Sequence, residues 1–310
     1  MGITDLFQQM LILMIFLAIG FIAGETGIID PEGNRKLTKL LLHVAQPAMI
    51  IDAAIGSQLS FSPADILRLL GFSCLMYAVL IALGYAVSPL FRVDAGRKNT
   101  FRFQCIFPNS AFMGFPVVAA MFGSDAVFIA SIFCVPFNFL AYSIGVLMLS
   151  GGRRRGMSWR VLLTPTMICT FLGVALIFTR PTLPYVITEA ADRLGGMAVP
   201  GSMLVIGATL SAAPVKSMFS DGHTYLLCLV RLILAPLAVW AVCGLFVKDA
   251  VFLGILTIIS AMPSAAISTM LSIEYGGDPD TASRGVFLTT LLSAATAPLM
   301  AYLLLILISD

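Results

Sequence analysis

The stretch "IFPNSAFMGFP", residues 106–116, places a proline and an asparagine side by side in a run that is otherwise apolar from Cys105 to Phe122. Proline has no backbone N–H and its ring clashes with the carbonyl one turn earlier, so it breaks or kinks a helix. Asparagine is unfavourable in an apolar environment unless it is hydrogen-bonded. The pair therefore predicts an interrupted helix with a polar group at the interruption.

The composition places this helix in a membrane. Apolar residues make up 59% of the 310 residues, charged residues make up 11%, and the mean hydropathy is +0.99. Soluble domains carry about 45–50% apolar and about 25% charged residues, so a soluble fold has too few charges to cover this chain. The formal net charge of +2 gives no reason to expect nucleic acid as a partner. We therefore expect a polytopic protein embedded in the lipid bilayer.

Ten apolar runs are long enough to cross a bilayer as helices. A hydrocarbon core of about 30 Å needs about 20 apolar residues, and the runs are continuous rather than alternating, which excludes a membrane β-barrel. The expected spans are 6–24, 37–56, 65–91, 99–122, 126–149, 160–179, 195–213, 224–247, 250–275 and 283–308. The predicted fold class is an all-α integral membrane protein with ten transmembrane helices.

The basic residues predict the orientation. Of the 18 lysines and arginines, 13 fall on one side of the predicted spans, four fall on the other side, and Arg231 lies within a span. The positive-inside rule puts the richer side in the cytoplasm. On that side lies a basic linker, residues 151–159, whose arginines at 153–155 are either a topology anchor or a lipid-headgroup site. We predict a multi-pass protein of the cell membrane (plasma or inner) with both termini outside.

The two halves of the chain, residues 1–150 and 160–310, resemble each other. Pro108 of "FPNSA" aligns with Pro263 of "MPSAA", 155 residues later, and two further segments match at nearly the same offset. Because each half holds five spans, an odd number, equivalent helices cross the membrane in opposite directions. This is an inverted-topology repeat, which is typical of secondary transporters.

Pro108 and Pro263 fall in matching helices, the fourth and the ninth. Each proline leaves N–H groups of the following half-helix without intrahelical partners, and irregular backbone at membrane depth is tolerated only where protein or water covers it. The breaks are therefore expected to cross near the midplane and to line a polar cavity, although a pair of packing kinks is the alternative. The new N-termini, at Asn109-Ser110 and at Ser264, favour anions. We expect a carboxylate to bind the N–H groups after both prolines and the Asn109 amide.

These residues resemble a known family. The segment "NSAFMGFP" is similar to the N-x-G-F-x-G-x-P segment of the auxin efflux carrier family, which includes plant PIN-type transporters and many bacterial members; Ala111 stands where the family often has glycine. The resemblance continues through residues 183–211, 260–283 and 291–304, so it covers essentially the whole chain, without the long central loop of the plant members. It implies a ten-helix fold of five-plus-five inverted repeats, with proline-broken crossover helices 4 and 9.

The resemblance also implies a way of working. It implies a scaffold part around helices 1, 2, 6 and 7, a transport part around helices 3–5 and 8–10, elevator-like movement and a homodimer. It places Asn109 near the substrate carboxylate and makes Asn138 a polar residue of the same cavity. The expected function is secondary transport of a small organic anion; a non-transporting receptor or sensor for a small carboxylate is the alternative. The substrate, the direction of transport and the coupling ion stay open.

Other polar residues of the spans have two interpretations each. Gln46 either lines the cavity from helix 2 or makes a packing hydrogen bond, and His43 is either a structural residue or a proton carrier. Arg231 either forms a structural ion pair with Glu274, as intramembrane charges usually do, or guides anions into the site. We predict the ion pair.

No enzymatic chemistry is expected. The segment "GGDPD" at 276–280 resembles the glycine-aspartate signature of intramembrane aspartyl proteases, but that chemistry needs two membrane-embedded aspartates that share a proton. Asp278 lies in a predicted loop, and the sequence contains neither an HExxH nor a GxSxG motif. The six cysteines lie in apolar spans and form no CxxC pair, so neither a metal site nor a cofactor is expected.

Overall fold

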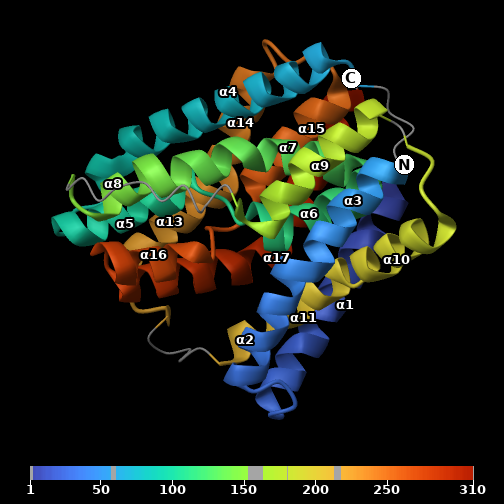
Figure 1. Cartoon of the computed structure of the whole chain (residues 1–310). Coiled ribbons are helices and arrows are strands. Elements are labelled where there is room, and N and C mark those ends of the chain that lie inside the picture. The colour runs from blue at the N-terminus through green and yellow to red at the C-terminus, as the bar shows by residue number, and fades with distance from the viewer. Residues whose placement is uncertain (1–2, 57–60, 153–162, 180, 213–217, 310) are drawn as a thin grey trace. The chain divides into compact units, whose positions relative to one another are not determined.

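The computed structural model describes residues 3–56, 61–152, 163–179, 181–212 and 218–309 (Figure 1). Within these residues the regular structure is helical, apart from one isolated antiparallel pairing between Pro108 and Ser264. The prediction of an all-α protein is therefore confirmed. The arginines at 153–155 and both chain ends, which enter the prediction of orientation, lie outside the described residues.

The helices follow the apolar runs of the sequence. Those of the first half are α1 (Ile3–Glu25), α2 (Pro31–Leu40), α3 (Gln46–Gly56), α4 (Pro63–Val87), α5 (Ala95–Ile106), α6 (Phe115–Phe122), α7 (Asp125–Leu140) and α8 (Val146–Leu149). Those of the second half are α9 (Pro165–Thr179), α10 (Tyr185–Gly196), α11 (Ala198–Ser211), α13 (Gly222–Leu229), α14 (Ala235–Cys243), α15 (Ala250–Ala261), α16 (Ile267–Tyr275) and α17 (Pro279–Ser309).

Several of these helices are long and apolar enough to cross a membrane. Within the described residues the long stretches are Pro31–Ile55, Pro63–Leu90, Asp125–Leu149, Tyr185–Ser211, Gly222–Cys243 and Pro279–Leu303. Shorter apolar helices accompany them at Leu11–Glu25, Ser110–Phe122, Pro165–Thr179 and Ala250–Ala261. Since each long stretch exceeds the length that a bilayer requires, the chain is a multi-pass membrane protein.

Single π-helical turns interrupt the helices at Leu41–Ala45, Ser110–Gly114, Ala141–Gly145 and Val230–Leu234. Of these four turns in the described part of the chain, three end two residues before a proline, namely Pro47, Pro116 and Pro236. A proline donates no hydrogen bond and crowds the carbonyl four residues earlier, which in each case lies inside the π turn. Local widening of the helix accommodates the ring without ending the helix.

The chain forms two compact units, and each takes stretches from both halves of the sequence. The first unit comprises Met1–Leu70, Ala111–Val135 and Leu162–Ala213, and the second comprises Gly71–Ser110, Pro136–Val161 and Pro214–Asp310.

In the first unit, α1 and α11 lie side by side with their backbones in contact (Figure 1). Gly207 of α11 lies against the Leu17 carbonyl oxygen and the Phe21 amide nitrogen of α1, so that a Cβ at this position would overlap both. Gly20 of α1 lies equally close to the backbone of Leu204. Small residues allow this approach, which is how membrane helices gain packing energy where lipid is as apolar as the protein.

In the second unit, an aromatic cluster surrounds the point where α5 ends. The ring of Phe107 lies 4.6 Å from that of Phe103, 5.8 Å from that of Phe137 and 6.4 Å from that of Tyr77, measured between centroids. Phe107 is completely buried. Aromatic pairs at these separations contribute beyond the area that they bury, so they fix the position of the first proline break.

Candidate functional site

The first break begins at Phe107, which directly follows the last residue of α5 and precedes Pro108. Phe107 leaves the helical conformation for an extended one, with φ −101° and ψ 110°, and its N–H donates to the Phe103 carbonyl over 3.0 Å. This is the conformation that a following proline imposes, because the proline ring disfavours a helical residue before it.

The second break repeats this arrangement. α15 ends at Ala261, and Met262 is extended, with φ −67° and ψ 151°, before Pro263. α16 resumes at Ile267. Both prolines named in the sequence therefore interrupt helices, and the same local rule explains both interruptions.

The two breaks pair with each other. The N–H of Asn109 donates to the carbonyl of Pro263 over 2.8 Å, and the N–H of Ala265 donates to the carbonyl of Phe107 over 2.9 Å. These two bonds form the antiparallel bridge between Pro108 and Ser264. Each break thus satisfies polar backbone groups of the other, which is necessary where no water reaches them.

This pairing corrects one expectation about the site. The N–H groups directly after the prolines were expected to be free for a carboxylate, but they already have protein partners. Besides the two bridge bonds, the N–H of Ser110 donates to the Pro108 carbonyl over 2.9 Å, and that of Ser264 donates to Thr289 Oγ1 over 3.1 Å. Thr289 lies on α17, 25 residues from Ser264, so no local rule of helix breaking indicates its role.

Other donors remain available beside the bridge. The side-chain amide of Asn109, which is 8% exposed, makes no hydrogen bond within the described residues, and neither does the buried hydroxyl of Ser110. The backbone N–H groups of Ala266 and Ile267 also lack partners in the described part of the chain, and Ala266 is exposed. Amide and hydroxyl donors at the start of a helix suit a carboxylate.

Arg231 lies next to both breaks, and the structure corrects the prediction of its partner. Its guanidinium donates from Nε to the Met262 carbonyl over 2.9 Å, from one terminal nitrogen to the Cys105 carbonyl over 2.9 Å, and from the other to the Ser260 carbonyl over 2.6 Å. The side chain is completely buried. The predicted ion pair with Glu274 does not form among the described residues, because the packing of the second unit directs Arg231 to backbone oxygens at two helix ends.

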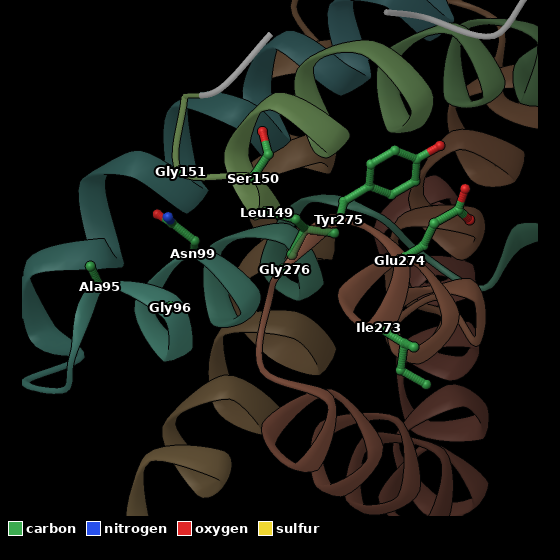
Figure 2. Close-up of a pocket in the computed structure, with 10 residues that line it drawn as sticks. All are labelled: Ala95, Gly96, Asn99, Leu149, Ser150, Gly151, Ile273, Glu274, Tyr275 and Gly276. Carbon is green, nitrogen blue, oxygen red and sulfur yellow. The ribbon is translucent and has the colours of Figure 1, made fainter. Parts of the chain in front are cut away.

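Glu274 is exposed and lines a pocket of about 520 Å³ at the opposite ends of α5 and α16 from the bridge (Figure 2). The first turn of α5, the end of α8 and the end of α16 form its wall. The lining residues are Ala95, Gly96, Asn99, Leu149, Ser150, Gly151, Ile273, Glu274, Tyr275 and Gly276.

The remaining predicted residues have separate places. Gln46 is completely buried in the first unit, where its Nε2 donates to the Ala111 carbonyl over 2.9 Å. Asn138 of α7 is half-buried and directly follows Phe137, whose ring packs on Phe107. His43 is exposed, and its Nδ1 lies 2.9 Å from the Lys39 carbonyl one turn earlier.

Gln104 is a residue of the site that the sequence did not single out. It is completely buried on α5, and its Nε2 donates to the Ala282 carbonyl over 2.7 Å and to Ser268 Oγ over 3.2 Å. The main-chain carbonyl of Gln104 accepts a hydrogen bond from Ser264 Oγ over 3.3 Å. An uncharged amide one turn before Pro108 was the available signal, since a buried amide requires partners.

Known proteins resemble the chain over nearly its full length. A sequence model of the family described as "Membrane transport protein" matches residues 5–158 and 153–301. The chain is 27% identical over 308 residues to an "Uncharacterized transporter" of Methanothermobacter thermautotrophicus (strain Delta H), in a match that covers 98% of this chain and 99% of the relative. It is 24% identical over 306 residues to a protein of the same description from Methanocaldococcus jannaschii, covering 95% and 97%.

A bacterial relative has a more specific name. The chain is 24% identical over 302 residues to a protein of Rhizobium meliloti (strain 1021) named "Putative malonate transporter", and the match covers 92% of each chain. Together with the family match, these relatives confirm the resemblance that the proline-asparagine segment carries. The protein belongs to the membrane transport protein family, the family of the auxin efflux carriers.

Proposed function

We propose that this protein is a secondary transporter that moves a small organic anion, a carboxylate, across the cell membrane. The observation that carries the proposal is the bridge between the two proline breaks, beside which the Asn109 amide and the Ser110 hydroxyl lack partners among the described residues. Polar side chains buried in a membrane protein are costly unless they serve a ligand or a partner. The name of the Rhizobium relative supports a carboxylate as the class of substrate.

In this proposal the carboxylate accepts hydrogen bonds from Asn109 and Ser110, and from N–H groups at the start of α16 rather than from those next to the prolines. The paired breaks lie near the membrane midplane and belong to a five-plus-five inverted repeat. The part that carries the breaks moves in an elevator-like manner against a scaffold formed around the first, second, sixth and seventh predicted spans, residues 6–24, 37–56, 160–179 and 195–213. The protein is a homodimer of the cell membrane, with both chain ends outside.

Two measurements test the function. Purified protein is first screened for thermal stabilisation by mono- and dicarboxylates, aromatic acids and amino-acid derivatives, with malonate as the first probe, because a ligand that binds the folded state raises the unfolding midpoint. A radiolabelled form of the ligand is then offered to proteoliposomes that hold a concentration gradient. Saturable uptake, absent from protein-free liposomes, is the expected result.

The outcomes separate the candidate functions. Binding without flux in proteoliposomes of either protein orientation means that the protein is a receptor or sensor. Failure of every carboxylate to stabilise folded protein contradicts the assignment of the bridge as an anion site.

A further inference from the structure

Arg231 is a buried cation whose hydrogen bonds, among the described residues, all go to main-chain carbonyls. The three described bonds end on carbonyls of Cys105, Ser260 and Met262, which belong to the last turns of α5 and α15 or directly follow them. Arginine stays protonated in proteins at neutral pH. The structure thus holds a full positive charge at the carbonyl ends of the two helices that stop at the bridge.

These helix ends are unfavourable for an anion. The last four carbonyls of a helix lack intrahelical partners, and the helix dipole places about half a negative charge at that end. α5 and α15 both end at the bridge, so two such ends meet where the carboxylate is proposed to bind. Without a compensating cation, their combined field would oppose the favourable field of the N-terminus of α16.

The location of Arg231 in the fold has a local cause. It lies in the π-helical turn Val230–Leu234, which ends two residues before Pro236. A π turn rotates the following side chains relative to an ordinary helix and is frequent at functional sites. The completely buried guanidinium donates its described hydrogen bonds to carbonyls. It therefore acts on a ligand through its charge rather than through direct contact.

We propose that Arg231 is the positioning residue that sets the anion preference of the bridge, because it neutralises the carbonyl ends of α5 and α15 while holding them together. The inference rests on the proposed function and adds a residue and a physical cause to it. A charge inside a medium of low dielectric acts over several ångströms with little screening. Its effect therefore scales with the charge of the ligand.

The test compares malonate with malonamate, its nearly isosteric monoamide, at pH 7.5. Affinities are measured on purified folded protein, as wild type and as Arg231→Gln and Arg231→Lys. Arg231→Gln removes the charge, and we expect it to weaken the binding of malonamate by roughly 10-fold and the binding of malonate by roughly 100-fold. The difference arises because malonate has two negative charges that interact with the arginine and malonamate has one. Arg231→Lys keeps the charge but not the three-way bonding, so it should keep the ratio of the two affinities within about 3-fold of wild type and lower the unfolding midpoint.

Arg102→Gln is the matched control. Arg102 also lies in the second unit, on α5, but it donates to the side chains of Ser88 and Asn99 rather than to helix-end carbonyls. Its removal should leave the ratio of the two affinities unchanged.

Several results overturn the inference. Arg231 has only a structural role if the ratio of malonate affinity to malonamate affinity is unchanged in folded Arg231→Gln. The same conclusion follows if this ratio is as low in Arg231→Lys as in Arg231→Gln. If Arg231→Gln does not fold, the test uses folded Arg231→Lys alone. Loss of its preference for malonate over malonamate likewise shows that Arg231 has only a structural role. If another carboxylate emerges from the screen, it and its amide replace malonate and malonamate. Wild-type protein that binds no carboxylate contradicts the proposed function itself, which distinguishes that failure from a failure of the role of Arg231.

Discussion

At the scale of single residues, backbone N–H groups at the bridge already have hydrogen-bond partners, whereas the side chains of Asn109 and Ser110 have none among the described residues. The N–H of Asn109 is committed to the Pro263 carbonyl, whereas its side-chain amide makes no hydrogen bond within the described part of the chain. The residue thus combines a structural bond from its main chain with a candidate ligand bond from its side chain. A substitution of the Asn109 side chain leaves the main-chain bond in place and changes only the candidate bond to the ligand.

We expect Asn109→Ala to weaken carboxylate binding by about 10- to 100-fold, because one hydrogen bond to a charged group contributes about 1.5–3 kcal/mol. Asn109→Asp is nearly isosteric but brings a negative charge to the anion, so it should bind more weakly than the alanine variant. Isothermal titration of folded protein with the carboxylate from the screen measures both. Asn99→Ala, at the other end of α5, is the control and should bind as wild type does. Wild-type affinity in Asn109→Asp would falsify the assignment of this side chain.

At the scale of elements, the contact between α1 and α11 depends on glycine. We expect Gly207→Ala to lower the free energy of unfolding by about 1–3 kcal/mol, because the new methyl group overlaps the Leu17 carbonyl and helices packed on backbone have no side chain that can move away. Thermal unfolding in detergent measures the change. The control is Gly71→Ala on α4, where a Cβ meets nothing within 4 Å. Alanine there should be neutral or stabilising by up to about 1 kcal/mol, and equal destabilisation by both substitutions would contradict the close contact.

The beginning of α13 is joined to α5 by a polar cluster. Asp221 accepts from the His223 N–H over 3.1 Å and forms an ion pair with Arg97. Burial acts to raise the pKa of the Asp221 carboxyl, but the hydrogen bonds from His223 and the charge of Arg97 outweigh it and hold the pKa below its ordinary value of 3.8. Because the folded-state pKa is below the unfolded-state pKa, the resulting stabilisation is complete above the unfolded-state value and is lost as the pH falls through the folded-state value.

We therefore expect Asp221→Asn to destabilise the protein at pH 7 by about 1.5–3 kcal/mol, the contribution of hydrogen bonds to a charged group. The difference between the unfolding midpoints of wild type and Asp221→Asn should narrow as the pH falls below 3.8, the ordinary pKa of the carboxyl. Asp280→Asn, which removes an exposed carboxylate in the first turn of α17, serves as the control and should change the midpoint only slightly. A gap that stays constant throughout the acid series would contradict the role of the charge.

At the scale of the whole molecule, orientation rests on the distribution of basic residues. We expect a single cysteine placed at position 154 to react with an impermeant thiol reagent only from the cytoplasmic side, and cysteines near positions 1 and 310 to react from outside. The experiment uses a variant without the six native cysteines, all of which are free thiols. A cysteine in the loop between α14 and α15, at Lys248, is a second outside marker. Labelling of position 154 from outside would contradict both the orientation and the inverted repeat.

Local rules accounted for much of the fold. Composition predicted an all-helical membrane protein, because the free energy of transfer into lipid is close to additive along the chain. Pro108 and Pro263 predicted both breaks, since a proline restricts its own backbone and that of the preceding residue whatever surrounds it. The same rule applies at Pro47, Pro116 and Pro236, where it produced π turns rather than breaks. The sequence did not distinguish these two outcomes, because a helix continues past a proline only where neighbouring groups satisfy the displaced backbone.

The sequence by itself determined that this chain is a helical membrane protein broken at two prolines, and only the tertiary structure decided which polar groups meet there. Sequence reasoning paired Arg231 with Glu274 as its carboxylate partner, whereas the fold gave it three carbonyls, one of them on Cys105, 126 residues away. Likewise, local rules left the N–H groups of Asn109 and Ala265 without partners, and in the fold the opposite break supplies a carbonyl to each of them. Every residue carries a carbonyl and almost every residue carries an N–H, so the choice among them depends on distances that packing sets and that residue types do not encode.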